Sequence, residues 1–467
     1  MRSNLTGFLP EATDNRDLRL DRSCERVERN GGRVPAKSRN QNALSSRLAM
    51  FILAAAPALQ WMTIFGTLVP GDFGVLPFTG VGIAIRDHRD WNQNRLRREL
   101  RLPAVCIVLG SVLALWDLGP VGWALKTLFQ DLVVTMTFLG LLAYARKRAL
   151  DSAYLAKWVA VTLTVISLVE VMSAGYRPTA TLAQSNVTGH FFVCAMLFSL
   201  PKLPRRWWLI LPLVVVAVGR TGSFGALLSL PIALAYLGFG AMRRRMRDAS
   251  SIHVFTSWLL VLAPMMVLAA LTFGAVAERA AEKNAGLGSD RLSSSSDGRI
   301  IIWKEGLTAW QGDPLGLGPH GFKELRIDWR FGEQIADASE IHNDMLGYLV
   351  ERGPLGLFGL LMLYRALWAA GAKGGVARAL LIANAIGGMT HETLHFRVLW
   401  VLLALALASE LHDRPQRQPR TRYGRRRARM EAAQRAEPEL TTVMVPTDEL
   451  PAATVAVLAP LVVGDRR

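Results

Sequence analysis

The residues best suited to chemistry in this sequence are a histidine and three arginines that stand among or beside long apolar runs. His342 follows the polar stretch 277–341 and precedes an apolar run. A helix that begins here places His342 in its first turn, where the helix dipole lowers the imidazole pKa and favours the neutral, proton-accepting form. The alternative is a surface histidine that bonds a loop carbonyl. His342 is therefore a candidate general base.

Arg220 lies between two apolar runs, in VVVAVGRTGSFGALL, with no acidic residue near it in the sequence. An arginine in or at a membrane is energetically expensive and indicates function, unless its side chain snorkels to the surface. Arg177 and Arg299 are expected on the same side of the membrane. The three could build a positive pocket, because guanidinium groups bind diphosphate oxygens in a bidentate way and do not titrate.

The elements that must position these residues are apolar runs. The chain has 467 residues, of which 51% are hydrophobic. Some runs reach the roughly 20 residues of a bilayer span, whereas shorter ones fit tilted, kinked or partly re-entrant helices. We predict an all-α integral membrane protein with about twelve transmembrane helices and one large external loop that contains short helices. The runs are 48–69, 72–85, 102–118, 121–145, 154–175, 187–200, 207–219, 222–240, 255–276, 345–370, 376–391 and 396–411.

The positive charge predicts the orientation of these helices. The formal net charge is +17, and the basic residues gather after every even-numbered run. This alternation follows the positive-inside rule. It places both termini in the cytoplasm and the 277–341 connection outside, in the periplasm of a Gram-negative cell. Because the basic residues are spread over short cytoplasmic loops, nucleic-acid binding is disfavoured.

The chain is thereby divided into five parts. Charged tails without periodicity, 1–45 and 412–467, are expected to be largely disordered and cytoplasmic. Residues 46–276 hold transmembrane segments one to nine, 277–341 form the periplasmic loop, and 342–411 hold segments ten to twelve. The apolar end, AATVAVLAPLVV, is too short to span a bilayer. Three cysteines without a CxxC motif or a Cys/His cluster offer neither a disulfide framework nor a metal site, and we expect no cofactor.

The loop sequence predicts a helix followed by a turn. Asp297 can cap a helix that Gly312–Pro314 ends, and Ser293–Ser296 is expected to be a flexible lead-in. The helix carries an apolar stripe that either lies at the membrane interface or packs on the transmembrane bundle. Its members are Ile300, Trp303, Leu307 and Trp310.

Three stretches of this loop and the next helix resemble the O-antigen ligase/polymerase family of bacterial inner-membrane proteins. They are Arg299 with Trp303; the turn with Pro314, Gly316, Gly318, Gly321 and Phe322; and His342–Asn343 followed by Leu346, Glu351–Arg352–Gly353 and Gly356. Asn186 in QSNVTGHF and Arg220 in GRT resemble two further family segments. The resemblance covers roughly residues 45–411. Family members often carry His and Ser where this chain has Glu340 and Val218.

The resemblance implies a metal-independent transferase. Its donor is a glycan on undecaprenyl diphosphate, and its acceptor is a sugar hydroxyl on lipid A–core or on another lipid-linked glycan. His342 matches the essential loop histidine of the family, and Glu340 either orients it or acts as the base itself. Arg220, helped by Arg177 or Arg299, binds the diphosphate. The supporting residues are Asn343, Asn186, Trp303, Gly318, Gly321 and Glu351.

Four alternatives stay open. Ligase, polymerase and protein O-glycosylation activities share donor and topology, so the sequence does not separate them. A transporter or flippase of lipid-linked glycans would also fit twelve spans. Against transport, the two halves show no obvious internal repeat, and the large loop carries a histidine suited to proton transfer.

Overall fold

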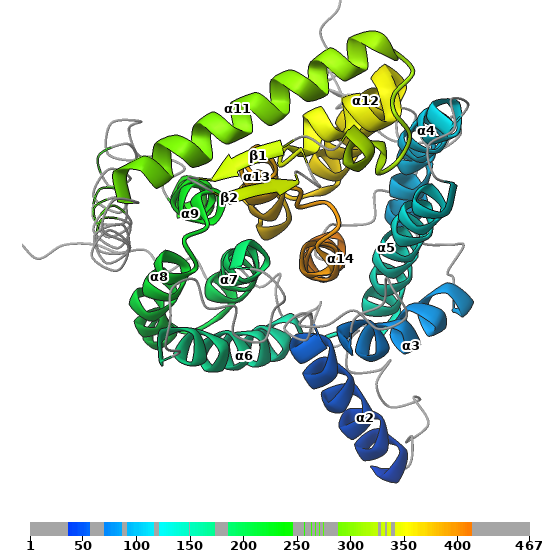
Figure 1. The fold of residues 1–467 in the computed structure, drawn as a ribbon. Helices are drawn as coiled ribbons and strands as arrows, with labels where there is room; N and C mark the ends of the chain where they lie inside the picture. The colour runs from blue at the N-terminus through cyan, green and yellow to red at the C-terminus, as the bar shows by residue number, and fades with distance from the viewer. Residues whose placement is uncertain are drawn as a thin grey trace, which may run out of the picture. The chain divides into compact units, whose positions relative to one another are not determined.

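The computed structural model of this chain is almost entirely helical in the residues that it describes (Figure 1). They belong to one compact unit, Met1–Pro415. The described ranges are 36–56, 70–85, 91–115, 121–148, 150–172, 185–245, 288–325, 328–331, 334–337 and 341–412, with five single positions between 256 and 274. Residues 1–35 and 413–467 of the expected tails, Arg177 and Glu340 lie outside them.

The helices follow the apolar runs in order. They are α2 (Ala36–Ala55), α3 (Pro70–Ala84), α4 (Trp91–Ala114), α5 (Val121–Arg148), α6 (Ser152–Met172), α7 (Ser185–Ser199), α8 (Ile210–Thr221), α9 (Phe224–Arg245), α11 (Gly288–Gly312), α12 (Asp344–Ala370), α13 (Val376–Gly388) and α14 (Arg397–His412), with the 3₁₀ turns η4 (Leu200–Lys202), η5 (Arg205–Leu209) and η6 (Gly321–Leu325). The loop 277–341 also holds a hairpin that the sequence did not predict, in which β1 (Asp328–Phe331) pairs antiparallel with β2 (Gln334–Asp337).

Four helices of the described part are long and apolar enough to cross a membrane. They are Leu125–Arg148, Ser152–Met172, Phe224–Arg243 and Asp344–Ala370. The prediction of an α-helical membrane protein is thereby confirmed. The count of twelve spans stays a prediction, because most of segment 255–276 lies outside the described residues.

The core is built around α7 and α14, which lie in the interior of the view in Figure 1. α7 is buried from Val187 to Ser199, and it packs against α6, α8, α9, α13 and α14. A helix that is apolar on every side is stable only when other elements surround it. The charged side chains of the site are therefore held at the ends of these helices.

Three helices begin earlier than the sequence predicted. α2 starts at Ala36, so residues 36–45, expected to belong to a disordered tail, are helical. α4 starts at Trp91, so Arg95, Arg97, Arg98 and Arg101 lie on a helix and not in a loop. α11 starts at Gly288, which makes Ser293–Ser296 helical and corrects the expected flexible lead-in. Serine is only mildly unfavourable in helices, so four in a row do not end one.

α12 has a sharp kink at Gly353, whose φ of +64° is in the left-handed region and precedes Pro354. Only glycine adopts this conformation readily, and proline cannot donate the next helical hydrogen bond. The glycine-rich turn after α11 packs against this kink, where Leu317 N donates a hydrogen bond to Val350 O at 2.9 Å. A Cβ on Gly316 would lie only 2.6 Å from Gly353 N, so the two backbones meet directly.

Candidate functional site

His342 lies immediately before α12, in the left-handed region with a φ of +56°. Asn343 is the N-cap residue, and its Oδ1 accepts a hydrogen bond from Leu346 N at 3.0 Å. Its Nδ2 also donates to Met389 O at 3.5 Å. The predicted helix start is thus confirmed. His342, however, precedes the N-cap, so its expected place in the first turn is corrected by two residues.

The pKa of His342 is lowered to about 4. Burial is the larger cause, because it disfavours the charged imidazolium, and the positive charge of Arg299 is the second cause. At neutral pH the imidazole is uncharged and can accept a proton.

His391 stacks on His342, with ring centroids 5.1 Å apart and planes 18° apart. Nδ1 of His391 lies 3.5 Å from Nδ2 of Asn186, the second residue of α7. Phe396 packs on His391 and on His190 of α7, at 5.8 Å and 5.7 Å. Asn186, expected to support the site, therefore reaches His342 through His391.

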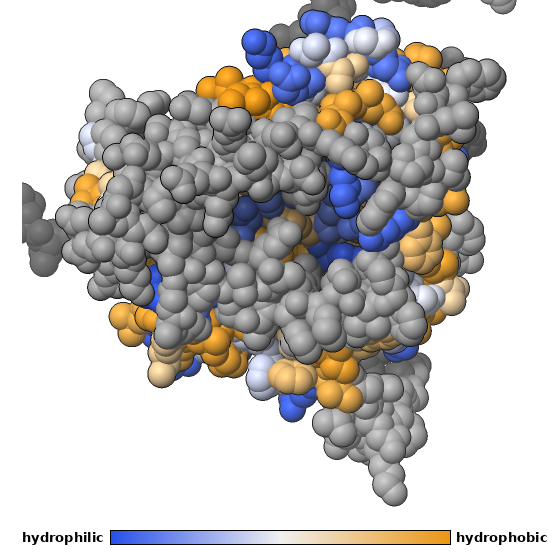
Figure 2. Space-filling view, viewed as in Figure 1, coloured by the Kyte–Doolittle hydropathy of each residue, from blue (hydrophilic) through white to orange (hydrophobic). Residues whose placement is uncertain are grey.

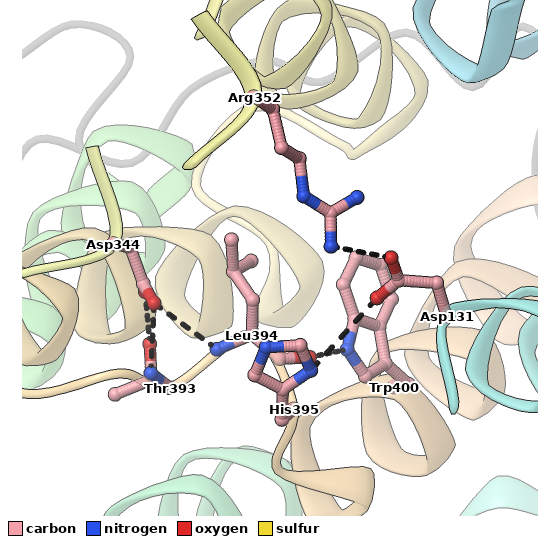
Figure 3. Close-up of polar contacts among 7 residues, drawn as sticks. All are labelled: Asp131, Asp344, Arg352, Thr393, Leu394, His395 and Trp400. Atoms are coloured by element: carbon pink, nitrogen blue, oxygen red, sulfur yellow. Dashed lines mark hydrogen bonds and ion pairs between the residues drawn. The ribbon is translucent and has the colours of Figure 1, made fainter. Parts of the chain in front are cut away.

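Asp344 fixes the two histidines relative to each other. This buried carboxylate accepts hydrogen bonds from Thr393 N at 2.9 Å, from Thr393 Oγ1 at 2.6 Å and from Leu394 N at 3.4 Å (Figure 3). These bonds join the start of α12 to the segment 389–396 that links α13 and α14. Because His342 and His391 stand on these two pieces of backbone, the bonds of Asp344 set their stacking.

α11 covers the site with one face. Trp303 Nε1 donates to Ile341 O at 2.9 Å, directly before His342. Ile302 and Ile341 are fully buried together with Phe322 and Val350, and Trp303 packs on this small core. Arg299 precedes Ile302 and Trp303 by three and four positions, so it shares their helix face.

The predicted stripe of α11 is therefore partly wrong. Trp303 and Trp310 pack inward, but Ile300 and Leu307 are 58% and 38% exposed. Ile302, which the spacing left out, takes the buried place. The exposed pair fits the alternative of contact with the membrane interface.

The glycine-rich turn 314–322 packs between the end of α4 and the kink of α12. Gly318 has a φ of +85° and lies close to the end of α4, since a Cβ on it would stand 3.4 Å from Ala114 O. Gly321 begins η6 and packs on Leu317, and the backbone of Glu351 contacts Gly316. These supporting residues shape the turn through their backbones.

Arg220 stands at the C-terminal end of α8, where Gly222 closes the helix with a φ of +62°. Its Nε donates to Glu170 O, in the last turn of α6, at 3.2 Å. The negative ends of two helix dipoles thus stabilise the guanidinium. The carboxylate of Glu170 interacts electrostatically with Arg220 and is fully buried, without a hydrogen-bond partner in the described part of the chain.

Arg220 and His342 lie at the same end of the helical bundle. Gly189 of α7 packs on Thr221 and Ser223, close to Arg220, while Asn186 of the same helix reaches His391. Among the described residues, no hydrogen bond or ion pair joins Arg220 to His342 directly.

Comparison with known families bears on this arrangement. Residues 208–361 match the family model of the O-antigen ligases. The resemblance to this family is confirmed. The O-antigen ligase match contains Arg220, Arg299, Trp303 and His342. No curated protein matches the chain. The match and the apolar helices together support a membrane protein of a family associated with glycosyl transfer.

Beyond the O-antigen ligase match, the sequence analysis missed the segment His391–Phe396. It interrupts two apolar runs with three ionisable residues on the predicted outer side, and that clustering was the available signal. Its letters, HETLH, also fit a zinc-protease pattern, which needs both histidines on one helix face. Here the segment is not helical, and the two histidines face different partners, Asn186 and Asp131.

A buried ion pair was also missed. Arg352 of α12 is 2% exposed, and its Nη2 lies 2.5 Å from Oδ2 of Asp131 on α5 (Figure 3). His395 Nδ1 lies 3.8 Å from the other oxygen of Asp131, and the guanidinium stacks on the Tyr348 ring at 4.6 Å. Asp131 and His395 stay partly exposed. Figure 2 shows hydrophilic residues around a hollow in this region of α5, α12 and α14.

We predict that Asp131→Ala destabilises the protein by about 3–5 kcal/mol, because it leaves the Arg352 charge buried and uncompensated. Thermal unfolding in detergent measures this change. Adding Arg352→Met to Asp131→Ala should recover much of the loss. Glu99→Ala, which breaks the exposed Arg95–Glu99 pair, is the control and should cost less than about 1 kcal/mol. Equal effects of the two alanine variants would contradict the role of the buried pair.

Proposed function

We propose that this chain is a membrane glycan transferase of the O-antigen ligase type. It moves an oligosaccharide or polysaccharide from undecaprenyl diphosphate to an acceptor sugar hydroxyl at the periplasmic face, in ligation or polymerisation of surface polysaccharide or lipopolysaccharide. The observation that carries the proposal is the neutral, partly buried His342 beside Arg299, both inside the family match.

The proposed reaction needs one base and one stabilised leaving group. Nε2 or Nδ1 of His342 takes the proton of the acceptor hydroxyl, whose oxygen attacks the anomeric carbon of the donor sugar. The bond from that carbon to the diphosphate oxygen breaks, and undecaprenyl diphosphate leaves with the electron pair. Glu340, two residues before His342, is proposed to orient the imidazole or to serve as the base in its place.

Arginines stabilise the diphosphate as its charge grows. Arg299 adjoins His342, and Arg220 stands at the same end of the bundle, held by the Glu170 carbonyl. Arg177 is proposed to join them. Planar guanidinium groups bind phosphate oxygens in pairs, which provides leaving-group stabilisation. We therefore expect transfer without a metal or a cofactor, and activity that withstands chelation by EDTA.

Binding of the donor also raises the pKa of His342. Without the donor, Arg299 on α11 lowers the His342 pKa, and His391 of segment 389–396 stacks on the imidazole. A bound diphosphate compensates the Arg299 charge, so the imidazole becomes more basic only when the donor is in place. This order suppresses proton abstraction before the leaving group is bound.

The proposed location is the bacterial inner membrane, with multiple spans, cytoplasmic termini and a periplasmic site. The ends of α6 and α8 and the starts of α7 and α12 lie together around the site, as expected if the helices alternate in direction. The partners are the lipid-linked donor, the glycan or lipid A–core acceptor and the membrane lipids.

His342→Asn should lower the transfer rate of the purified protein by roughly 10²–10⁴-fold, the usual contribution of a general base. Asparagine tolerates the left-handed backbone at this position better than alanine, so the change removes the imidazole with little strain. The assay follows transfer of a labelled glycan from a lipid-linked donor. His412→Asn, at the exposed end of α14, is the control. Normal transfer by His342→Asn would refute the assignment.

The pH dependence of transfer should show two different acid limbs. That of kcat/KM, which reports the free enzyme, should lie near pH 4, and that of kcat should lie higher, because the bound diphosphate compensates Arg299. Arg299→Gln should move the kcat/KM limb upward toward the ordinary pKa of histidine, since one of the two causes is removed. If the acid limb of kcat/KM in Arg299→Gln lies at the same pH as in the parent protein, the Arg299 charge does not lower the His342 pKa.

Arg220→Lys should reduce kcat/KM by roughly 10–150-fold, because lysine keeps the charge but loses one of the two parallel hydrogen bonds, worth about 1.5–3 kcal/mol. Steady-state kinetics with varied lipid-linked donor measure the change. The exposed Arg95→Lys serves as the control. Full activity of Arg220→Lys would show that a positive charge at position 220 is enough to bind the diphosphate, without the paired hydrogen bonds of a guanidinium group.

Analysis of glycans in a deletion strain separates the versions of this function. Surface chains of single repeat units would indicate a polymerase, full-length chains left on the lipid carrier would indicate a ligase, and loss of glycan from proteins alone would indicate protein O-glycosylation. A transporter would instead leave the donor on the cytoplasmic side, and its activity would not depend on His342.

A further inference from the structure

A groove of about 540 Å³ lies between α3, α4 and α5, away from the site. α4 packs mainly on α12, whereas α5 packs on α3 and α14, so the space between α4 and α5 is left open to the surface. Its lining combines arginines and apolar side chains: Ile83, Asn94, Arg97, Arg98, Arg101, Met136 and Leu139.

The polar lining is one continuous stripe of α4. Asn94, Arg97, Arg98 and Arg101 are spaced by three, one and three residues, which places them on the same helix face. The nearest acidic residue of α4, Glu99, pairs with Arg95 outside the groove at 2.8 Å. Three guanidinium groups of one helix face therefore line the groove.

The same face of α4 continues as an apolar strip. Val105, Val108 and Val112 follow Arg101 at helical spacing and are 50%, 52% and 51% exposed. On α5, Leu125, Phe129 and Leu132 lead to Met136 with the same spacing and similar exposure. Positive charges and long apolar strips thus adjoin at the level where the polar half of α4 meets its apolar half.

We propose that this groove binds an anionic membrane phospholipid. The lipid phosphate lies on Arg97, Arg98 and Arg101, and the acyl chains lie along the apolar strips of α4 and α5. Basic pockets between membrane helices attract anionic head groups, and guanidinium forks match phosphate oxygens. A free phosphate or a nucleotide would use the charges but leave the apolar strips uncovered.

This lipid is separate from the proposed glycan donor. Ala114, the last residue of α4, adjoins Gly318 of the turn below the site. From Arg101 to Ala114 the helix rises by roughly 20 Å. The groove and the site therefore face opposite leaflets, and the proposal does not depend on the transferase function.

The test measures lipid binding to the purified full chain in detergent, by native mass spectrometry and thermal unfolding. Phosphatidylglycerol should remain bound and raise Tm, whereas phosphatidylethanolamine and inorganic phosphate should not. The triple variant Arg97→Gln/Arg98→Gln/Arg101→Gln should bind phosphatidylglycerol about 100-fold more weakly, because each arginine contributes about 1 kcal/mol. Arg95→Gln, on the same helix but outside the groove, should leave it unchanged.

Three outcomes would overturn the proposal. Equal binding of phosphatidylglycerol by the triple variant and the parent chain would remove the arginines from the site. Equal stabilisation by phosphatidylglycerol and phosphatidylethanolamine would indicate that only the acyl chains bind. Stabilisation by inorganic phosphate would indicate a site for a free anion. If the triple variant fails to fold, Met136→Asp, which places a negative charge in the groove and leaves the arginines intact, provides the same test.

Discussion

The site depends on one buried carboxylate, that of Asp344. A carboxylate without water must find donors within the protein, and Asp344 finds them in Thr393 and Leu394. The requirement ties the start of α12 to the segment before α14, although the two are far apart in sequence. The stacking of His342 on His391, the approach of Asn186 and the closeness of Asp131 to His395 all follow from this attachment.

Charge in an apolar bundle is tolerated here only where the backbone or an opposite charge compensates it. Arg220 lies at the carbonyl ends of α6 and α8, Arg352 meets Asp131, and Arg397 meets Asp72 at 2.7 Å. Each of these arginines joins two helices that are separated in sequence. The polar residues of the membrane part thus have a structural task as well as a proposed chemical one.

Sequence patterns predicted what is local and periodic. The helical membrane class, the helix start after His342 and the turn before Gly321 follow from apolar spacing and from glycine and proline chemistry. Pairings between distant segments left no such pattern: His391 and Arg352 acquire their partners only when α12, α13 and α14 fold together. The start of α4 was misplaced because its first turns are basic, and hydropathy does not distinguish a basic helix from a basic loop.

The kink at Gly353 divides α12 into two mechanical parts. Before the kink, α12 contacts the loop 277–341 and segment 389–396. After the kink, α12 packs along α4, where a Cβ on Gly359 would lie 2.8 Å from Ile107. Substitutions in the first part can reshape the wall around His342 without disturbing the packing of the second. The two parts of α12 can therefore change in sequence independently of each other.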